Sequence, residues 1–172
     1  MSSYYSVQEK SNSAYVNTLI DNCRNKKVLE YGCGTGSMAF LISQNGGHVT
    51  GIDISDVGIE VAKKIAVDSK LDIDFHVMDA EELNFDNNTF HLICGSAILH
   101  HLHLEKAYSQ LNRVVNKDGL IVFVEPLGHN PLLNLYRQLT PSIRTSDEHP
   151  FKVKDIKLLN KHFKKVNVIK FC

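Results

Sequence analysis

Apolar residues along this chain follow two alternating spacings. Apolar runs of strand length occur at 28–31, 48–53, 73–79, 90–98 and 120–124. Between them, apolar residues recur at helical spacing, as in the segment from Ser37 and in the segment after Ser55, a residue type that favours the N-cap of a helix. A further helical face lies at 104–115. Strands that alternate with helices are typical of an α/β domain with a doubly wound, mostly parallel sheet.

The pattern changes near the C-terminus. Residues 125–150 form a long irregular stretch that holds all four prolines. A connection of this length inside a compact domain is usually a lid or binding wall, or else it is disordered. A last helix, with Ile156, Leu159 and Phe163 on one face, leads to a sixth strand at 166–171. We expect a single domain over 1–172, with an N-terminal helix or lid at 1–25.

Composition narrows the function classes. The chain has 172 residues, which suits one domain, and 43% of them are apolar, which suits a packed core. Its 19 basic residues equal its 19 acidic residues, and a net charge of zero argues against charge-driven binding to nucleic acid or anionic membrane. We find no apolar run of membrane-spanning length and no signal peptide, and the four scattered cysteines favour reduced thiols. These features predict a soluble, cytoplasmic protein.

The segment VLEYGCGTG at 28–36 marks a candidate site, because Gly32, Gly34 and Gly36 follow a predicted strand at alternate positions. In a doubly wound sheet, ligands bind outside the carboxyl ends of the strands. Glycine there adopts dihedral angles closed to other residues and lets main chain approach a ligand closely. Three glycines in this place favour a ligand cradle over a plain tight turn.

Acidic residues at the ends of the strands indicate which ligand the cradle takes. The third glycine lies one position too early for the dinucleotide fingerprint GxGxxG, and Glu30 suits an ammonium group better than a pyrophosphate. Asp53 lies about twenty residues beyond the first glycine, the distance of an acid that binds ribose hydroxyls, which fits NAD equally well. Asp79 either reaches an adenine edge or caps the turn at 81–83.

Several segments between residues 28 and 125 together resemble the class I S-adenosylmethionine-dependent methyltransferases. They are VLEYGCGTG, GIDIS, MDAEELNF, and FHLIC followed by ILHHL. The small-molecule branch that includes ubiquinone-biosynthesis enzymes is the more similar one. The resemblance implies a Rossmann-like sheet and S-adenosylmethionine as the cofactor, with methyl transfer to an O, N or C atom of a small-molecule acceptor and S-adenosylhomocysteine as product. The cofactor-binding residues it implies are Glu30, Gly32, Cys33, Gly34, Gly36, Asp53, Ile54, Asp79, Ala80 and Ser96. The alternatives are a cofactor-binding module with little or no activity and, less favoured, a nicotinamide-dependent oxidoreductase.

Histidines after the fourth strand are candidates for catalysis. His100 and His101 lie where the acceptor should bind, and histidine suits proton abstraction near neutral pH, although either could instead bond backbone or shape the pocket. No carboxylate or cysteine completes a metal site in HHxH, so we expect no metal. Glu125 either contacts substrate or caps its loop. The substrate-binding candidates are Tyr4, Tyr5, Glu125, His129 and Arg137.

The family's sheet has seven strands, of which the sequence predicts six. The last one, at 166–171, would lack its hairpin partner, and a bare edge strand is a liability. Three explanations compete: a truncated chain, a naturally short one, or an edge completed by a second copy in a homodimer.

Overall fold

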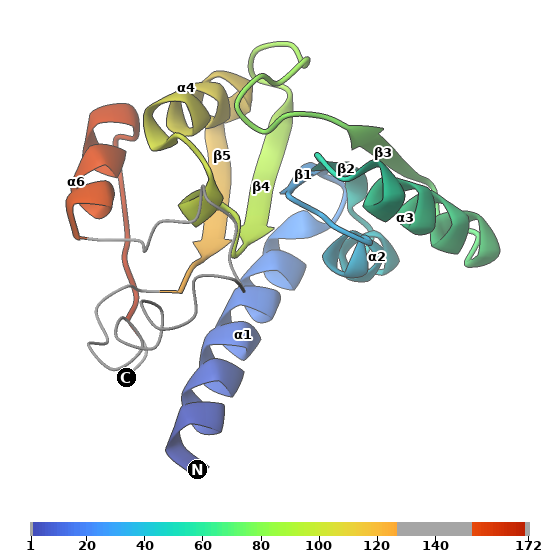
Figure 1. Cartoon of the computed structure of the whole chain (residues 1–172), viewed down its shortest axis with the longest axis horizontal. Coiled ribbons are helices and arrows are strands. Elements are labelled where there is room, and N and C mark those ends of the chain that lie inside the picture. Colours follow the sequence, from blue (N-terminus) through green and yellow to red (C-terminus); the bar gives the residue numbers. More distant parts are fainter. Residues whose placement is uncertain (1, 127–152, 171–172) are drawn as a thin grey trace, which may run out of the picture.

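The computed structural model describes residues 2–126 and 153–170. Figure 1 shows its elements, which are α1 (Ser2–Cys23), β1 (Lys27–Tyr31), α2 (Ser37–Gln44), β2 (His48–Asp53), α3 (Asp56–Asp68), β3 (Ile73–Val77), β4 (Phe90–Ser96), the 3-10 turn η1 (Leu99–His101), α4 (Leu104–Val114), β5 (Val115–Val124) and α6 (Val153–His162). Most of the predicted stretch at 125–150, with His129 and Arg137, lies outside the described residues, and Tyr4 and Tyr5 lie in α1.

The five strands form one parallel sheet in the order β3-β2-β1-β4-β5. This order confirms the predicted doubly wound α/β fold. The chain runs outward from β1 to β3 and then returns to place β4 on the other side of β1. The carboxyl end of β1 is therefore the point where the strand order reverses, and such a crevice is where open α/β sheets bind ligands.

Helices cover both faces of the sheet (Figure 1). One face packs on α1, α2 and α3, with Leu19, Ile42 and Ala62 at the centre of that core. The other face packs on α4 and α6. Successive residues of a strand point to opposite faces, so Val28 enters the first core and Leu29 the second. The predicted N-cap is confirmed, because Ser55 Oγ accepts a hydrogen bond from Gly58 N at the start of α3.

The prediction of a sixth strand is wrong for the part of it that the structure describes. Residues 166–170 follow α6 without pairing with any strand. A strand needs a neighbour for its backbone hydrogen bonds, and here Val168 and Ile169 are 47% and 74% exposed instead of lying on a sheet. The predicted homodimer depended on an edge strand that is absent from these residues. β5 also begins earlier than predicted, at Val115 rather than Leu120.

No helix among the described residues is long and apolar enough to cross a membrane.

The centre of the sheet leaves no room at Gly95 in β4. A Cβ atom built there would lie 2.8 Å from both Phe123 Cδ1 and the carbonyl oxygen of Tyr31. Because backbone cannot move aside cheaply, we expect Gly95→Ala to lower the free energy of unfolding by about 1–3 kcal/mol. Chemical denaturation measures this, and a variant as stable as the natural chain would show that β1, β4 and β5 pack less tightly than described.

Candidate functional site

Apart from Tyr4 and Tyr5 in α1, the candidate residues on the described segments gather along one edge of the sheet. Asp53 and Ser96 are the last residues of β2 and β4, Asp79 follows β3, and Glu125 follows β5. The glycine segment leaves β1 between them. Because all five strands are parallel, their carboxyl ends meet at the same edge, and the topology alone brings these residues together.

The three glycines have different roles, although all three adopt left-handed φ angles, of +75° at Gly32, +52° at Gly34 and +85° at Gly36. A Cβ atom at Gly32 would lie 2.8 Å from Ile98 Cγ1, and one at Gly36 would lie 2.8 Å from Phe75 Cζ. These two glycines make room for the protein's own side chains. Among the residues that the structure describes, a Cβ atom at Gly34 would meet nothing within 4 Å. The open side of the turn is therefore at Gly34.

Asp53 fixes the shape of this turn. Its Oδ2 accepts a hydrogen bond from Gly34 N at 2.7 Å, and its Oδ1 accepts one from Ser55 N at 2.9 Å. The carboxylate thus ties the loop after β1 to the loop after β2. The next side chain, Ile54, is 77% exposed and offers an apolar surface beside the turn.

Glu30 is a buried acid on the same side of the site, with only 7% of its surface exposed. Its Oε2 accepts a hydrogen bond from Ala39 N in α2 at 2.8 Å. Burial raises the pKa of the Glu30 carboxyl to about 8; the Ala39 N–H opposes this shift and the charge of Asp53 adds to it. Within residues 2–126 and 153–170, no basic side chain forms an ion pair with it. The site therefore has an acid that a bound cation would stabilise in its charged form.

Cys33, between the first two glycines, contributes a backbone hydrogen bond to the turn and has no reactive side chain. Its backbone N–H donates to Ile52 O at 2.8 Å, and its side chain is buried. Burial, together with the charges of Glu30 and Asp53, raises the pKa of the Cys33 thiol to about 12. A thiol of this kind is unreactive at neutral pH.

The loop after β3 is fastened to β1 by a residue that the sequence did not single out. The hydroxyl of Tyr31 donates a hydrogen bond to Ala80 O, and its buried ring packs edge-to-face on Phe123 with centroids 5.8 Å apart. The exposed carboxylate of Asp79 accepts from Glu81 N at 2.7 Å, as the capping alternative expects. An aromatic residue at the end of β1 was the only sequence signal for the Tyr31 contact.

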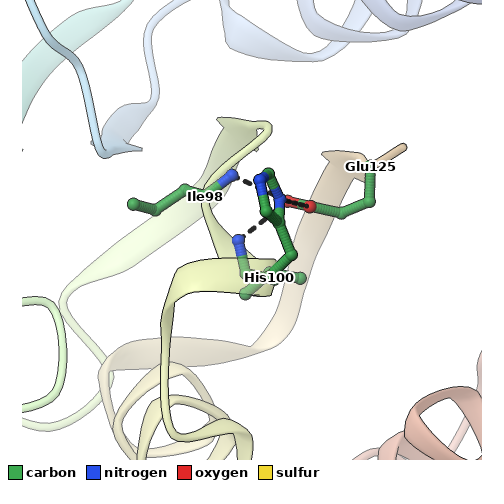
Figure 2. Close-up of polar contacts among 4 residues, drawn as sticks. Ile98, His100 and Glu125 are labelled. Carbon is green, nitrogen blue, oxygen red and sulfur yellow. Dashed lines mark hydrogen bonds and ion pairs between the residues drawn. The ribbon is translucent and has the colours of Figure 1, made fainter. Parts of the chain in front are cut away.

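His100 and Glu125 form a partly buried pair at the ends of β4 and β5 (Figure 2). Glu125 Oε2 lies 2.8 Å from His100 Nδ1, and Glu125 Oε1 accepts from Ile98 N at 2.9 Å and from Leu99 N at 2.8 Å. Both oxygens of Glu125 are thus engaged by η1 and its N-cap, which is the loop-capping alternative. The ring of His101 lies on that of His100, with centroids 4.1 Å apart.

Among the described residues, no group of three or more histidine, cysteine, aspartate or glutamate side chains is arranged to hold a metal ion.

Known proteins share this fold. A family model described as "Methyltransferase domain" matches residues 28–119. Among solved structures, a putative methyltransferase from Bacillus halodurans has a TM-score of 0.75 at 21% identity, and the match covers 88% of this chain and 68% of that one. A geranyl diphosphate methyltransferase in complex with SAM has a TM-score of 0.74 at 16% identity, and the match covers 87% and 64% of the two chains.

Curated relatives carry a more specific name. The ubiquinone biosynthesis O-methyltransferase of Coxiella burnetii (strain RSA 493 / Nine Mile phase I) is 35% identical over 113 residues, 66% of this chain and 48% of the relative. That of Nitrosomonas europaea is 28% identical over 123 residues, 71% of this chain and 52% of the relative. The chain thus spans about half the length of these relatives. With the family model covering more than half of the chain and the sheet order matching, the chain belongs to the class I S-adenosylmethionine-dependent methyltransferases, with distant homology to ubiquinone biosynthesis O-methyltransferases.

Proposed function

We propose that the chain binds S-adenosylmethionine beside Gly34 and transfers its methyl group to a small-molecule acceptor. The open space at Gly34, flanked by acids from β1 and β2, is the observation that carries this proposal. The other two glycines are filled by the protein's own side chains, so the space at Gly34 is not a general looseness of the turn.

The charges of the site suit this cofactor, which brings an ammonium group and a sulfonium. Glu30 and Asp53 provide two carboxyl groups close enough for the charge of Asp53 to raise the pKa of Glu30. A cation placed near them lowers the cost of keeping both ionised. A pyrophosphate in the same place would be repelled, which disfavours a nicotinamide dinucleotide.

We assign each of the remaining candidate residues a role in binding the cofactor or the acceptor. Asp53 is the acid for the ribose hydroxyls, and the exposed Ile54 offers an apolar contact for the adenine, with Asp79 and Ala80 on its other side. Ser96, at the end of β4, lies along the same edge as the cradle. His100 and His101 follow it, on the side from which an acceptor approaches.

The cofactor supplies a methyl carbon that is already activated by the positive sulfur. The chain's own part is to hold the acceptor in line behind that carbon and to exclude water. Positioning of this kind is worth about 7–11 kcal/mol of the barrier, and a general base adds about a hundredfold or more when the acceptor must lose a proton.

The test is transfer of a labelled methyl group from S-adenosylmethionine to a panel of phenols, catechols, amines and carboxylic acids. We expect one acceptor class to yield labelled product together with one equivalent of S-adenosylhomocysteine. Binding of S-adenosylhomocysteine without product from any acceptor would instead support the cofactor-binding module. If the chain binds NAD but not S-adenosylhomocysteine, the proposal is wrong.

A further inference from the structure

Glu125 makes one contact more than is needed to cap the loop after β4. Two adjacent backbone N–H groups, of Ile98 and Leu99, already satisfy Oε1 of Glu125. The second oxygen is directed at a side chain, the ring nitrogen Nδ1 of His100, at 2.8 Å. Both side chains are nearly buried, at 9% exposed for His100 and 7% for Glu125. Figure 2 shows Glu125 reaching from the end of β5 to the turn that follows β4.

We propose that Glu125 is a positioning residue that holds His100 in one tautomer, with Nε2 as the base that removes the proton of the acceptor. This inference rests on the proposed function. It also narrows the acceptor to a group that must lose a proton, a hydroxyl or N–H, and a phenol-like hydroxyl is the class that a histidine base suits best.

The tautomer follows from the donor and acceptor inventory. An ionised carboxylate can only accept hydrogen bonds, so the nitrogen that faces Glu125 Oε2 must carry a proton. In the neutral ring the other nitrogen, Nε2, then holds the free lone pair. Within the described part of the chain nothing hydrogen-bonds to this nitrogen, and it is not among the polar atoms that are both unpaired and fully buried. It is therefore free to accept a proton.

The proposed step moves a proton to His100 and a methyl group to the acceptor. The acceptor O–H bond breaks as its proton passes to Nε2 of His100, and the oxygen lone pair forms a bond to the methyl carbon. The carbon–sulfur bond breaks with its electron pair remaining on sulfur, and the imidazolium later releases its proton to solvent. Glu125 stays ionised throughout and stabilises the imidazolium.

The decisive variant is Glu125→Gln, because the backbone fixes how the new amide must sit. The N–H groups of Ile98 and Leu99 both require an acceptor, so the amide oxygen has to take the place of Oε1. The amide NH2 then faces Nδ1 of His100 and forces that nitrogen to accept. The ring proton moves to Nε2, and the base is lost while the loop keeps its cap. The equivalent change in the serine protease triad lowers kcat by about ten-thousandfold.

The tautomer can be read without any activity, from the long-range ¹H–¹⁵N correlations of the histidine rings. The signals of His100 are assigned by their absence in His100→Asn. We expect Nδ1 to be protonated and Nε2 unprotonated in the natural chain near pH 8, and the reverse in Glu125→Gln. A natural chain with Nε2 protonated overturns the proposal. This spectrum needs no variant at Glu125, so it decides the tautomer even where Glu125→Gln fails to fold.

Steady-state kinetics test whether this tautomer of His100 is needed for methyl transfer. We expect Glu125→Gln and His100→Asn each to lower kcat by about a hundredfold to ten-thousandfold, and the double variant to lower it no further. The affinity for S-adenosylhomocysteine should change less than threefold. Glu105→Gln makes the same change in a second glutamate–histidine pair, in which Glu105 Oε1 lies 3.3 Å from His162 Nε2, and should leave kcat unchanged. Normal kcat in Glu125→Gln overturns the positioning role, whereas absence of S-adenosylhomocysteine binding in every variant and in the natural chain overturns the proposed function.

Discussion

Replacing Gly34 by asparagine should weaken S-adenosylmethionine binding by about ten- to a hundredfold and leave the fold intact. Asparagine suits the test because the chain already places Asn25 and Asn88 at φ +58° and +55°, close to the +52° of Gly34. Its side chain would enter the space that is open beside Gly34. Atoms inserted into a filled contact cost about 1–3 kcal/mol, and the stated loss of affinity, about 1.4–2.8 kcal/mol, lies within this range.

The matched control is Gly46→Asn. Gly46 has a similar left-handed φ of +87°, and a Cβ atom there would lie 3.6 Å from Arg24 Cγ, an ordinary contact. It lies in the loop before β2, at the opposite end of that strand from Asp53. Isothermal titration calorimetry should therefore find natural affinity in Gly46→Asn and weakened binding in Gly34→Asn. Equal affinity in the two variants would mean that the ligand does not pass beside Gly34.

The contribution of Glu30 to the stability of the chain should fall as the pH rises from about 4.5 to about 8. The folded state raises the pKa of this carboxyl from 4.5 to about 8, so between these values the folded chain binds a proton that the unfolded chain does not. Below pH 4.5 the group is protonated in both states and costs nothing. Above pH 8 it is charged in both states, and the cost of burying that charge, on the order of a few kcal/mol, is fully present.

Glu30→Gln isolates this effect from the other titrating groups. The neutral amide oxygen can still accept the hydrogen bond from Ala39 N, so the variant keeps the contact and loses the buried charge. We expect it to unfold at higher denaturant concentration than the natural chain at pH 9 and at a similar concentration at pH 4. If the difference between the two chains does not change with pH, Glu30 is not the buried acid described here.

The strands, and the edge of the sheet where the candidate residues gather, were predictable because they follow from local pattern. Apolar runs predicted the strands, and Ser55 predicted the start of α3. Asp53 lies at the carboxyl end of its strand, as expected. The sixth strand failed because residues 166–170 carry a strand-like pattern, but a strand also needs a partner, which no local pattern specifies.

Other features of the candidate site could not be predicted, because they depend on contacts between segments that are distant in the sequence. The distinction between Gly34 and its two neighbours arises from Ile98 and Phe75, which are far away in sequence. The contact between Tyr31 and Ala80 has the same origin. For Glu125, the sequence left substrate contact and loop capping open, because only the folded chain shows which donors face its two oxygens.

The most direct test is a titration of the ¹⁵N-labelled chain with S-adenosylhomocysteine, followed by backbone amide chemical shifts. A saturable shift of the amides of Gly34, Ser55 and Ala80, which surround the carboxyl ends of β1, β2 and β3, is the predicted result. No shift at millimolar ligand, or shifts confined to the surface groove lined by Lys106, Ser109 and Gln110, would contradict a cofactor site at the glycine turn.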